Sequence, residues 1–140
     1  YALTPAQGTM FVDVNMDGDT ANNQYIFALG NGSTLNLTSI KIASGYMQGH
    51  VYNNNYQHNG VNNVVAIGNN KIAYAYSNTL AAAVVNGGVY NVGYADGYGV
   101  APYNTLTIGS GYDYLRRGYI RSVSYYPRPL TSSEMISITS

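Results

Sequence analysis

The segment KIAYAYSNTLAAAVVNGGVY, residues 71–90, predicts the fold of this chain more directly than any other. Bulky residues alternate with alanine over 72–76, which places Ile72 and both tyrosines on one face of a strand. Polar pairs at 78–79 and NGG at 86–88 interrupt the pattern, and Asn-Gly is the strongest short hairpin signal. The segment therefore predicts antiparallel strands joined by tight turns.

The same alternation continues on both sides of this segment. It predicts strands over 9–14, 24–30, 34–43, 46–53, 72–76, 80–85, 89–93, 105–109 and 118–126. A phase shift between Leu37 and Ile40 indicates a bulge or the meeting of two strands, and GNN at 68–70 is interpreted as a turn. The very polar segment 53–63 is not assigned to a strand. About ten short strands at this spacing are typical of an antiparallel sandwich, because two sheets are needed to bury so many apolar residues.

A short helix is expected only at the carboxyl end, over TSSEMISI. Thr131 and Glu134 have the spacing of a capping box, and the prolines at 127 and 129 stop the strand before it. We expect this helix to pack at a sheet edge. The predicted fold class is all-β: an antiparallel two-sheet jelly-roll sandwich with a short C-terminal helix, in a single domain over residues 1–140.

Composition narrows the function classes. Only 9% of residues are charged and the formal net charge is zero, which argues against a nucleic-acid partner. The chain has no cysteine, and its longest apolar run, 80–85, is too short for membrane insertion. A surface made of Asn, Ser, Thr, Gly and Tyr favours a virion or extracellular location. Because the sequence starts at Tyr1, we expect the chain to be part of a longer protein.

Three segments in order carry a family resemblance: KIAYAYSNTLAAAVVNGGVY, YNTLTIGSG and GYIRSVSYYPRPLTSSEM. Together they resemble the laminin G-like, concanavalin A-like lectin and glucanase sandwich. The YYPRPL ending with its capped turn is most similar to domains of bacteriophage tail fibre and virion proteins. The resemblance covers about half of the chain, residues 64–136, and implies attachment to a glycan or a cell surface.

Catalysis is not expected. Retaining glycoside hydrolysis needs two carboxyl groups about 5 Å apart, which a strand provides by placing acids at alternate positions. Glu134 is committed to the helix cap, whereas Asp96 and Asp113 stand alone in loops. His50 and His58 have no partner that the sequence identifies, so they are interpreted as polar strand or loop residues.

The stretch DVNMDGD, residues 13–19, has two open interpretations. Its side chains supply hard oxygen atoms suited to Ca²⁺, the one candidate cofactor. A helix-flanked calcium loop is not expected, because its twelfth position is Gln24 and its flanks are strands. The alternative is a solvated turn rich in turn formers. The candidate metal ligands are Asp13, Asn15, Asp17 and Asp19.

Two segments mix tyrosine with amide and carboxylate side chains, as sugar sites do. One is YADGYGVAPYN at 94–104, continued by GYDY at 111–114, and the other is YNNNYQHNG at 52–60. Aromatic rings stack on the apolar side of a pyranose, whereas amides and carboxylates bind its hydroxyl groups. The alternative is that these tyrosines cover a sheet or a neighbouring subunit. The candidate ligand-binding residues are Tyr94, Asp96, Tyr98, Tyr103, Asn104, Tyr112 and Asp113.

The sequence therefore predicts a non-catalytic carbohydrate- or cell-surface-binding module of a phage tail, virion or exported protein. Its expected partners are a glycan or bacterial surface polysaccharide and other subunits, in a homo-oligomer. The alternative is a structural module that joins subunits of a virion or fibre without a glycan ligand. Arg117 and Arg121 either guard a strand edge or make such a subunit contact.

Overall fold

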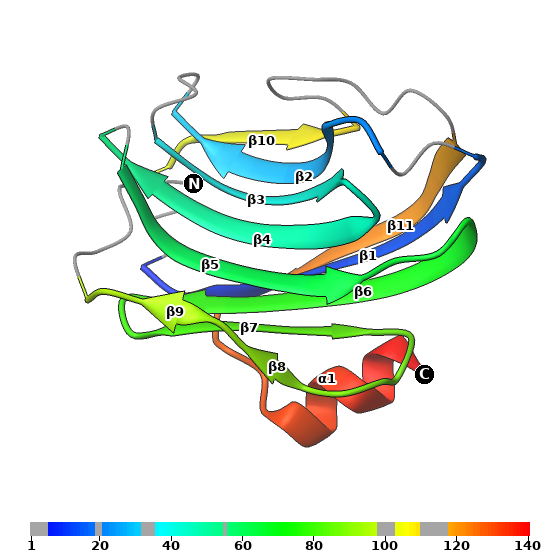
Figure 1. Ribbon diagram of the computed structural model, residues 1–140. Helices are drawn as coiled ribbons and strands as arrows, with labels where there is room; N and C mark the ends of the chain where they lie inside the picture. The colour runs from blue at the N-terminus through cyan, green and yellow to red at the C-terminus, as the bar shows by residue number, and fades with distance from the viewer. Residues whose placement is uncertain (1–5, 19–20, 32–35, 55, 98–102, 110–117) are drawn as a thin grey trace.

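The computed structural model describes residues 6–18, 21–31, 36–54, 56–97, 103–109 and 118–140 of the 140-residue chain. Within these ranges, strands form two stacked sheets and one helix lies beneath them (Figure 1). The elements are β1 (Gly8–Met16), β2 (Gln24–Gly30), β3 (Leu37–Ala43), β4 (Tyr46–Asn53), β5 (Tyr56–Val64), β6 (Gly68–Ser77), β7 (Leu80–Val85), β8 (Asn91–Val92), β9 (Tyr94–Ala95), β10 (Thr105–Ile108), β11 (Gly118–Tyr126) and α1 (Ser132–Thr139).

Sheet A has the strand order β11-β1-β6-β7-β8, and sheet B has the order β10-β2-β3-β4-β5-β9. Neighbouring described strands pair antiparallel throughout. The 71–90 segment forms the predicted hairpin between β6 and β7, and positive φ angles at Asn86 and Gly87 turn the chain after it. The predicted antiparallel two-sheet sandwich with a C-terminal helix is confirmed.

The core lies between the two sheets. Tyr74 and Tyr76 of β6 are fully buried in it, stacked on each other with ring centroids 5.8 Å apart. Tyr74 lies directly beneath β4, where a Cβ added to Gly49 would come within 2.4 Å of its ring. Glycine therefore gives sheet B the close approach that the large ring needs. Ile120 and Val123 of β11 both pack against this core because the register between β1 and β11 shifts at Asp13 and Val14; regular alternation would put them on opposite faces.

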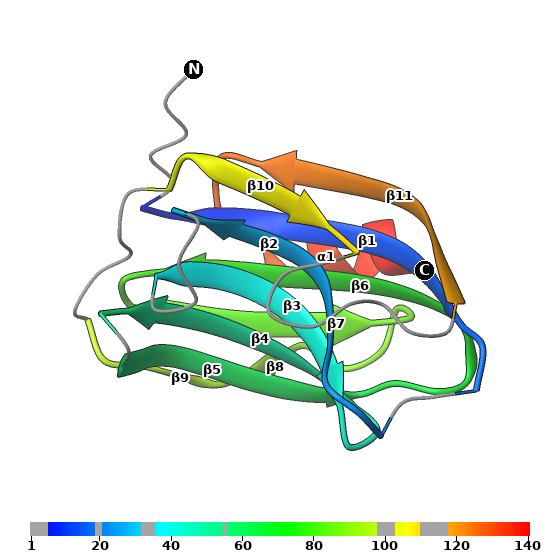
Figure 2. The same cartoon turned by 90° about the horizontal axis from the view of Figure 1, so that it is seen from above.

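One side of the sandwich is closed where the chain passes from sheet A to sheet B. Gly93 joins β8 to β9, and its amide donates to the Ala81 carbonyl at 2.8 Å. A Cβ at Gly93 would lie 1.8 Å from the Gly60 carbonyl oxygen, so only glycine fits between the sheets here. Figure 2 shows β8 and β9 along this side and the edge strands β10 and β11 along the other.

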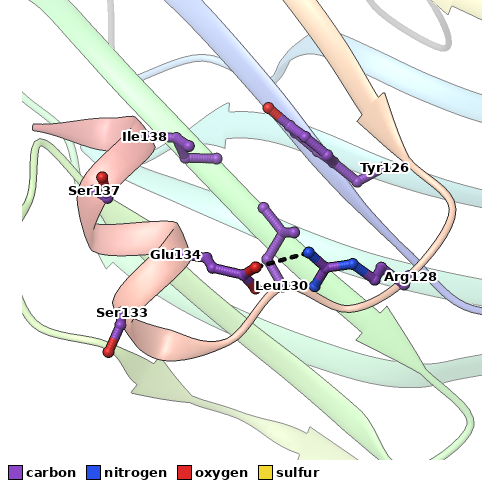
Figure 3. Close-up of a pocket in the computed structure, with 7 residues that line it drawn as sticks. All are labelled: Tyr126, Arg128, Leu130, Ser133, Glu134, Ser137 and Ile138. Atoms are coloured by element: carbon purple, nitrogen blue, oxygen red, sulfur yellow. Dashed lines mark hydrogen bonds and ion pairs between the residues drawn. The ribbon is translucent and has the colours of Figure 1, made fainter.

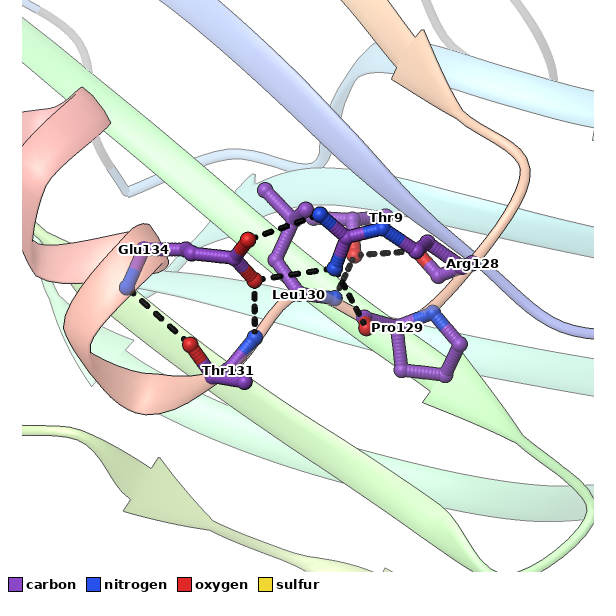
Figure 4. Close-up of polar contacts among 6 residues, drawn as sticks. All are labelled: Thr9, Arg128, Pro129, Leu130, Thr131 and Glu134. Atoms are coloured by element: carbon purple, nitrogen blue, oxygen red, sulfur yellow. Dashed lines mark hydrogen bonds and ion pairs between the residues drawn. The ribbon is translucent and has the colours of Figure 1, made fainter.

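Helix α1 begins with the predicted capping box. The Glu134 amide donates to Thr131 Oγ1 at 3.3 Å, and the Thr131 amide donates to Glu134 Oε2 at 2.8 Å (Figure 4). Arg128 forms two further bonds with the same carboxylate, at 2.7 and 2.9 Å. These bonds, with that of Arg128 first, lower the pKa of Glu134 to about 2.

The expected position of α1 is wrong. The helix does not cover a sheet edge but packs on the outward face of β6 and β7, near the middle of sheet A (Figure 1). Met135 is fully buried there against Ala73, Ala75 and Val84. The small outward side chains let the helix lie close to the strands, a feature that the edge interpretation ignored.

Three further expectations need correction. The GNN stretch at 68–70 is not a turn but the start of β6, paired with the end of β1. The polar segment 53–63 contains β5, which pairs with β4 along its length. The bulge expected in 34–43 lies instead in β2, between Tyr25 and Phe27. In the first two cases tertiary pairing overrides local composition. Among the described residues, no helix has the length and apolar character needed to cross a bilayer.

Candidate functional site

The outward face of sheet B carries a tract of polar and aromatic side chains. Strand register places them in two rows that run across the strands, because paired residues point to the same side. One row contains Tyr25, Lys41, Gln48 and Asn62, and the next contains Ala28, Ser39, His50 and Gly60. Figure 2 looks down on this face, and Figure 1 shows strand β4 curved, with its middle lower than its two ends.

Two polar groups at the centre of this face are buried without partners. Ser39 is 0% exposed and His50 is 6% exposed, and the two are directly paired across β3 and β4. Neither Ser39 Oγ nor His50 Nδ1 has a hydrogen-bond partner in the described structure. A buried polar group without a bond typically costs about 1–3 kcal/mol of stability, so each such group calls for an explanation, and a bound water, ion or ligand is one.

The electrostatics of this face are set by Lys41. Burial lowers the pKa of its ammonium group, whose Nζ lies 6.0 Å from the centre of the Tyr25 ring. Burial first, and then the charge of Lys41, lower the pKa of His50 to about 4. His50 is therefore a neutral imidazole at physiological pH, with one nitrogen that donates and one that accepts. The face combines a cation, a hydroxyl, an imidazole and two amides.

Toward β9 the same face becomes aromatic. Tyr94 pairs with Gly60, is 52% exposed, and donates its hydroxyl to the Gln57 carbonyl at 3.1 Å. Tyr52 donates its hydroxyl to Gln57 Oε1, also at 3.1 Å. Gln57 thus links the two rings at the edge of sheet B. The two segments that the sequence treats as separate candidates, 52–60 and 94–104, meet here.

His58 has the partner that the sequence did not reveal. Its Nδ1 lies 2.7 Å from Asp96 Oδ2, and the Asp96 amide donates to the His58 carbonyl at 3.1 Å. The two residues are 38 positions apart, so only the pairing of β5 with β9 brings them together. Asp96 is therefore not an isolated loop acid, as expected, but is hydrogen-bonded to His58 beside Tyr94.

The other predicted ligand-binding residues are dispersed. Asn104 lies at the start of β10, on the opposite edge of the six-stranded sheet from Tyr94 and Asp96. Tyr103 is only 2% exposed and accepts a hydrogen bond from Thr38 within the core, so it does not line an open surface, contrary to expectation. Tyr98, Tyr112 and Asp113 lie outside the described residues.

The predicted metal ligands do not form one loop in the described structure. Asp13 and Asn15 lie within β1, paired with Lys71 and Asn69, and Asp17 follows the strand. Asn15 Nδ2 donates to Asn69 Oδ1 at 2.7 Å. Asp13 Oδ1 is buried and unpaired in the described ranges, in a small hollow of about 260 Å³ that Lys71 also lines. Asp19 lies outside those ranges, and the calcium site stays a prediction.

A second hollow, of about 370 Å³, lies between α1 and the end of β11 (Figure 3). Its lining includes Tyr126, Leu130 and Ile138, and the Arg128–Glu134 ion pair crosses it. Both charged groups of that pair are already bonded to each other. Because its charges are satisfied within the chain, this hollow is a poorer candidate for ligand binding than the sheet B face.

No protein-family model and no curated protein sequence matches this chain. Among solved structures, the leech intramolecular trans-sialidase aligns with 99% of the chain at a TM-score of 0.79 and 16% identity. The chain spans only 25% of that protein. The CBM40 module of the Ruminococcus gnavus IT-sialidase, bound to α2,3-sialyllactose, aligns at a TM-score of 0.75 and 17% identity, over 96% of this chain and 82% of the module.

Mouse laminin α1 domains LG4–5 align with 91% of the chain and 37% of their own, at a TM-score of 0.64 and 9% identity. At these identities the comparisons establish a shared fold. They confirm the predicted jelly-roll sandwich and its laminin G-like architecture. The similarity to phage tail and virion proteins stays a prediction.

The centre of the sheet B face is not among the sites predicted from the sequence. Ser39 and Lys41 alternate with Ile40 and Ile42, and Gln48 and His50 occupy equivalent positions in the next strand. The apolar half of this alternation predicts the core face of the two strands. The polar half of two adjacent strands is the signal that would have found the site.

Proposed function

We propose that this chain is a non-catalytic glycan-binding module that binds a sugar on the outward face of sheet B. The observation that carries the proposal is the pair of buried, unpartnered groups Ser39 Oγ and His50 Nδ1 at the centre of that face. The fold it shares with a module solved in complex with sialyllactose supports the same conclusion.

The chemistry of the face suits a hydroxyl-rich ligand. Sugar hydroxyls donate and accept, so they match the bonding capacity of both Ser39 and a neutral His50. Because the two residues are 0% and 6% exposed, the groups that cover them must move aside when a sugar binds. Gln48 pairs across the strands with Lys41, which places an amide and an ammonium group side by side. An ammonium group attracts a carboxylate, so the face favours a sugar that carries an acidic group.

Isothermal titration calorimetry tests this proposal with 3′-sialyllactose and with lactose, which lacks the acidic sugar. We expect the wild-type chain to prefer 3′-sialyllactose. Ser39→Ala and Lys41→Met should each weaken that binding by about tenfold or more, the loss expected for one charge-assisted or buried hydrogen bond. Ser137→Ala is the matched control: it lies on α1, in the hollow between the helix and the end of β11, and should bind like the wild type.

Two outcomes would reject the proposal. One is a wild-type chain that binds no member of a broad glycan array, bacterial surface polysaccharides included. The other is binding that Ser39→Ala, Lys41→Met and His50→Gln all leave unchanged, because that glycan would then lie elsewhere.

The non-catalytic part of the proposal rests on where the described acids lie. Glu134 is held by Arg128 and the helix cap, Asp96 is paired with His58, and Asp13 belongs to sheet A. None of these carboxylates is paired with Ser39 or His50, so among the described residues the proposed site has no acid pair like that of a glycosidase. Release of sugar from a fluorogenic sialoside or β-glucan by the purified chain would contradict this part.

A second candidate function, contact between subunits of a virion, fibre or exported particle, has one observation in its favour. Strand β11 is an edge of sheet A with nine residues, whereas the edges β8, β9 and β10 have two to four. Long exposed edges tend to pair with another chain. Tyr119 on β11 is 53% exposed, and the apolar residues of β10 lie on the same side.

Analytical ultracentrifugation over a wide concentration range tests this second function. We expect a dimer that Tyr119→Lys disrupts, because a lysine on an edge strand opposes pairing with a second copy. A wild-type chain that stays monomeric at all concentrations would contradict contact through β11.

A further inference from the structure

We propose that Tyr94 forms a second sugar subsite beside the Ser39–His50 centre, so that the module recognises at least two linked sugars. This inference rests on the proposed function and names the kind of ligand that the same face takes: an oligosaccharide with an acidic sugar near Lys41 and a neutral sugar over Tyr94.

The ring of Tyr94 is exposed and yet held in place. About half of its surface is accessible, at 52%, while its hydroxyl is fixed by the bond to the Gln57 carbonyl. Its ring packs across Gly60, where an added Cβ would lie 2.9 Å from Tyr94 Cε1. The ring orientation is therefore set before any ligand arrives, which reduces the entropy lost on binding.

The second argument is the hydrogen-bonding group beside the ring. Gln57 Oε1 accepts from Tyr52, which fixes the amide so that Gln57 Nε2 lies over Gly60, 2.5 Å from where a Cβ would be. No described residue accepts a hydrogen bond from Nε2, so it is free to donate to a sugar hydroxyl. A ring and a free amide side by side are what a stacked pyranose needs.

The third argument is spacing. Gly60 pairs with His50 on one side and with Tyr94 on the other, so the three residues lie in one row across β4, β5 and β9. Neighbouring strands are about 4.8 Å apart, which puts Tyr94 about 10 Å from His50. Two linked pyranose rings can span this distance, whereas one cannot.

The fourth argument is charge. Asp96 follows Tyr94 closely and carries the carboxylate paired with His58 at 2.7 Å, whereas Lys41 lies three strands away on β3. An anionic sugar is repelled by a carboxylate and attracted by an ammonium group. The acidic sugar therefore belongs at the Lys41 end, and a neutral sugar, whose C–H face is attracted to the ring, at the Tyr94 end.

Calorimetry with two ligands tests this subsite: the methyl α-glycoside of N-acetylneuraminic acid and 3′-sialyllactose. We expect wild type to bind the trisaccharide more tightly. Tyr94→Ala should lower trisaccharide affinity about tenfold and leave the monosaccharide unchanged, because only the stacked sugar is lost. Tyr94→Phe keeps the ring and should retain most of the affinity. Tyr56→Ala, an exposed ring with no hydrogen bond in the described structure, is the control and should change neither.

The outcomes separate this inference from the proposed function. No binding of either ligand to wild type, or to any array glycan, would overturn both. Binding of both ligands with equal losses in Tyr94→Ala, or with no loss, would overturn the subsite alone. Thermal unfolding of every variant shows whether it is folded. Tyr94→Leu is a second variant without the aromatic ring, and when folded it must show the same selective loss of trisaccharide binding.

Discussion

The outward faces of the two sheets differ although both come from the same alternation of side chains. On sheet A, the covered outward positions of β6 and β7 include alanine and valine, and Met135 of α1 packs on them together with Leu130, which precedes the helix. On sheet B, the corresponding positions of β3 and β4 are Ser39, Lys41 and His50. The outward face of sheet A is covered by the chain's own helix. The outward face of sheet B is polar and has two buried groups without hydrogen-bond partners.

The polar groups around the helix show the contrast most clearly. Thr9 of β1 donates its hydroxyl to the Arg128 carbonyl at 3.0 Å and accepts from the Leu130 amide at 2.8 Å (Figure 4). The capping box and the Arg128–Glu134 pair satisfy the rest of the helix start. The polar groups at the helix start are therefore bonded within the chain, and Asp13 Oδ1 is the unpaired buried group described on the outward side of sheet A, whereas sheet B has two such groups side by side.

The largest effect should come from opening the covered face. Met135→Ala removes a fully buried side chain from beneath α1, and we expect a loss of about 2–5 kcal/mol in the free energy of unfolding. Glycan affinity of the folded protein should not change, because sheet B is untouched. Urea unfolding followed by circular dichroism measures the loss. A loss below about 0.5 kcal/mol would mean that the helix contributes little to the fold.

The next effect concerns the pH dependence of the polar face. His50 has a folded pKa of about 4 and an ordinary value of 6.5, so between these values the unfolded chain binds more protons. Stability is therefore unaffected above pH 6.5 and falls as the pH is lowered toward 4, by up to about 3 kcal/mol.

Thermal unfolding of wild type and His50→Gln between pH 7.5 and 4.5 checks this difference. The range stops at pH 4.5 because a second contribution to stability declines below pH 4.5. This is the contribution of Glu134, whose pKa is lowered from 4.5 to about 2 in the folded chain. The variant should lack part of the decline that wild type shows. Parallel curves would mean that His50 is hydrated or bonded in solution.

A smaller loss is expected at the helix start. Thr131→Ala removes the side chain that caps α1, and we expect a cost of about 1 kcal/mol in the free energy of unfolding. Chemical denaturation measures it, with Ser133→Ala as the control on the same helix turn. If both variants cost the same, the capping bond contributes no more than an ordinary exposed position of the helix.

The smallest expected effect is a gain, not a loss, in the free energy of unfolding, and it tests the polar face of sheet B directly. Ser39→Ala removes a buried hydroxyl without a described partner, so the ligand-free protein should be unchanged or up to about 1 kcal/mol more stable. A site kept for a ligand behaves this way, whereas a structural serine does not. Urea unfolding without glycan is the measurement. A destabilisation above about 1 kcal/mol would show that Ser39 already has a partner.

Much of the fold could be predicted from local patterns. The strands at 24–30, 46–53, 80–85 and 118–126 have the predicted bounds, and Thr131 and Glu134 form the predicted capping box. These features depend on near neighbours in the chain, which a sequence displays directly. The start of β6 and the whole of β5 could not be found this way, because pairing with β1 and β4 makes strands of glycine- and asparagine-rich segments.

The candidate site was only partly predictable. The composition of the segment 94–104 predicts Tyr94 and Asp96 as ligand-binding residues, and both lie at the edge of the proposed sugar face. Tyr103, chosen by the same rule, is buried instead, because its hydroxyl finds Thr38 in the core. Composition identifies residue types that can bind sugar, but the fold decides which of them lie on an outward face and which, like Tyr103, are bonded inside the core.

Local sequence patterns are sufficient to predict the alternating side chains of the strands, the hairpin turns and the helix cap. Together these features predict an antiparallel sandwich with one terminal helix. Each of these depends on residues within a few positions of one another. The tertiary structure alone decided that α1 covers β6 and β7, that His58 meets Asp96, and that Ser39 and His50 are buried side by side. Those facts depend on which distant strands pair, because pairing sets both the neighbours and the solvent exposure of each side chain.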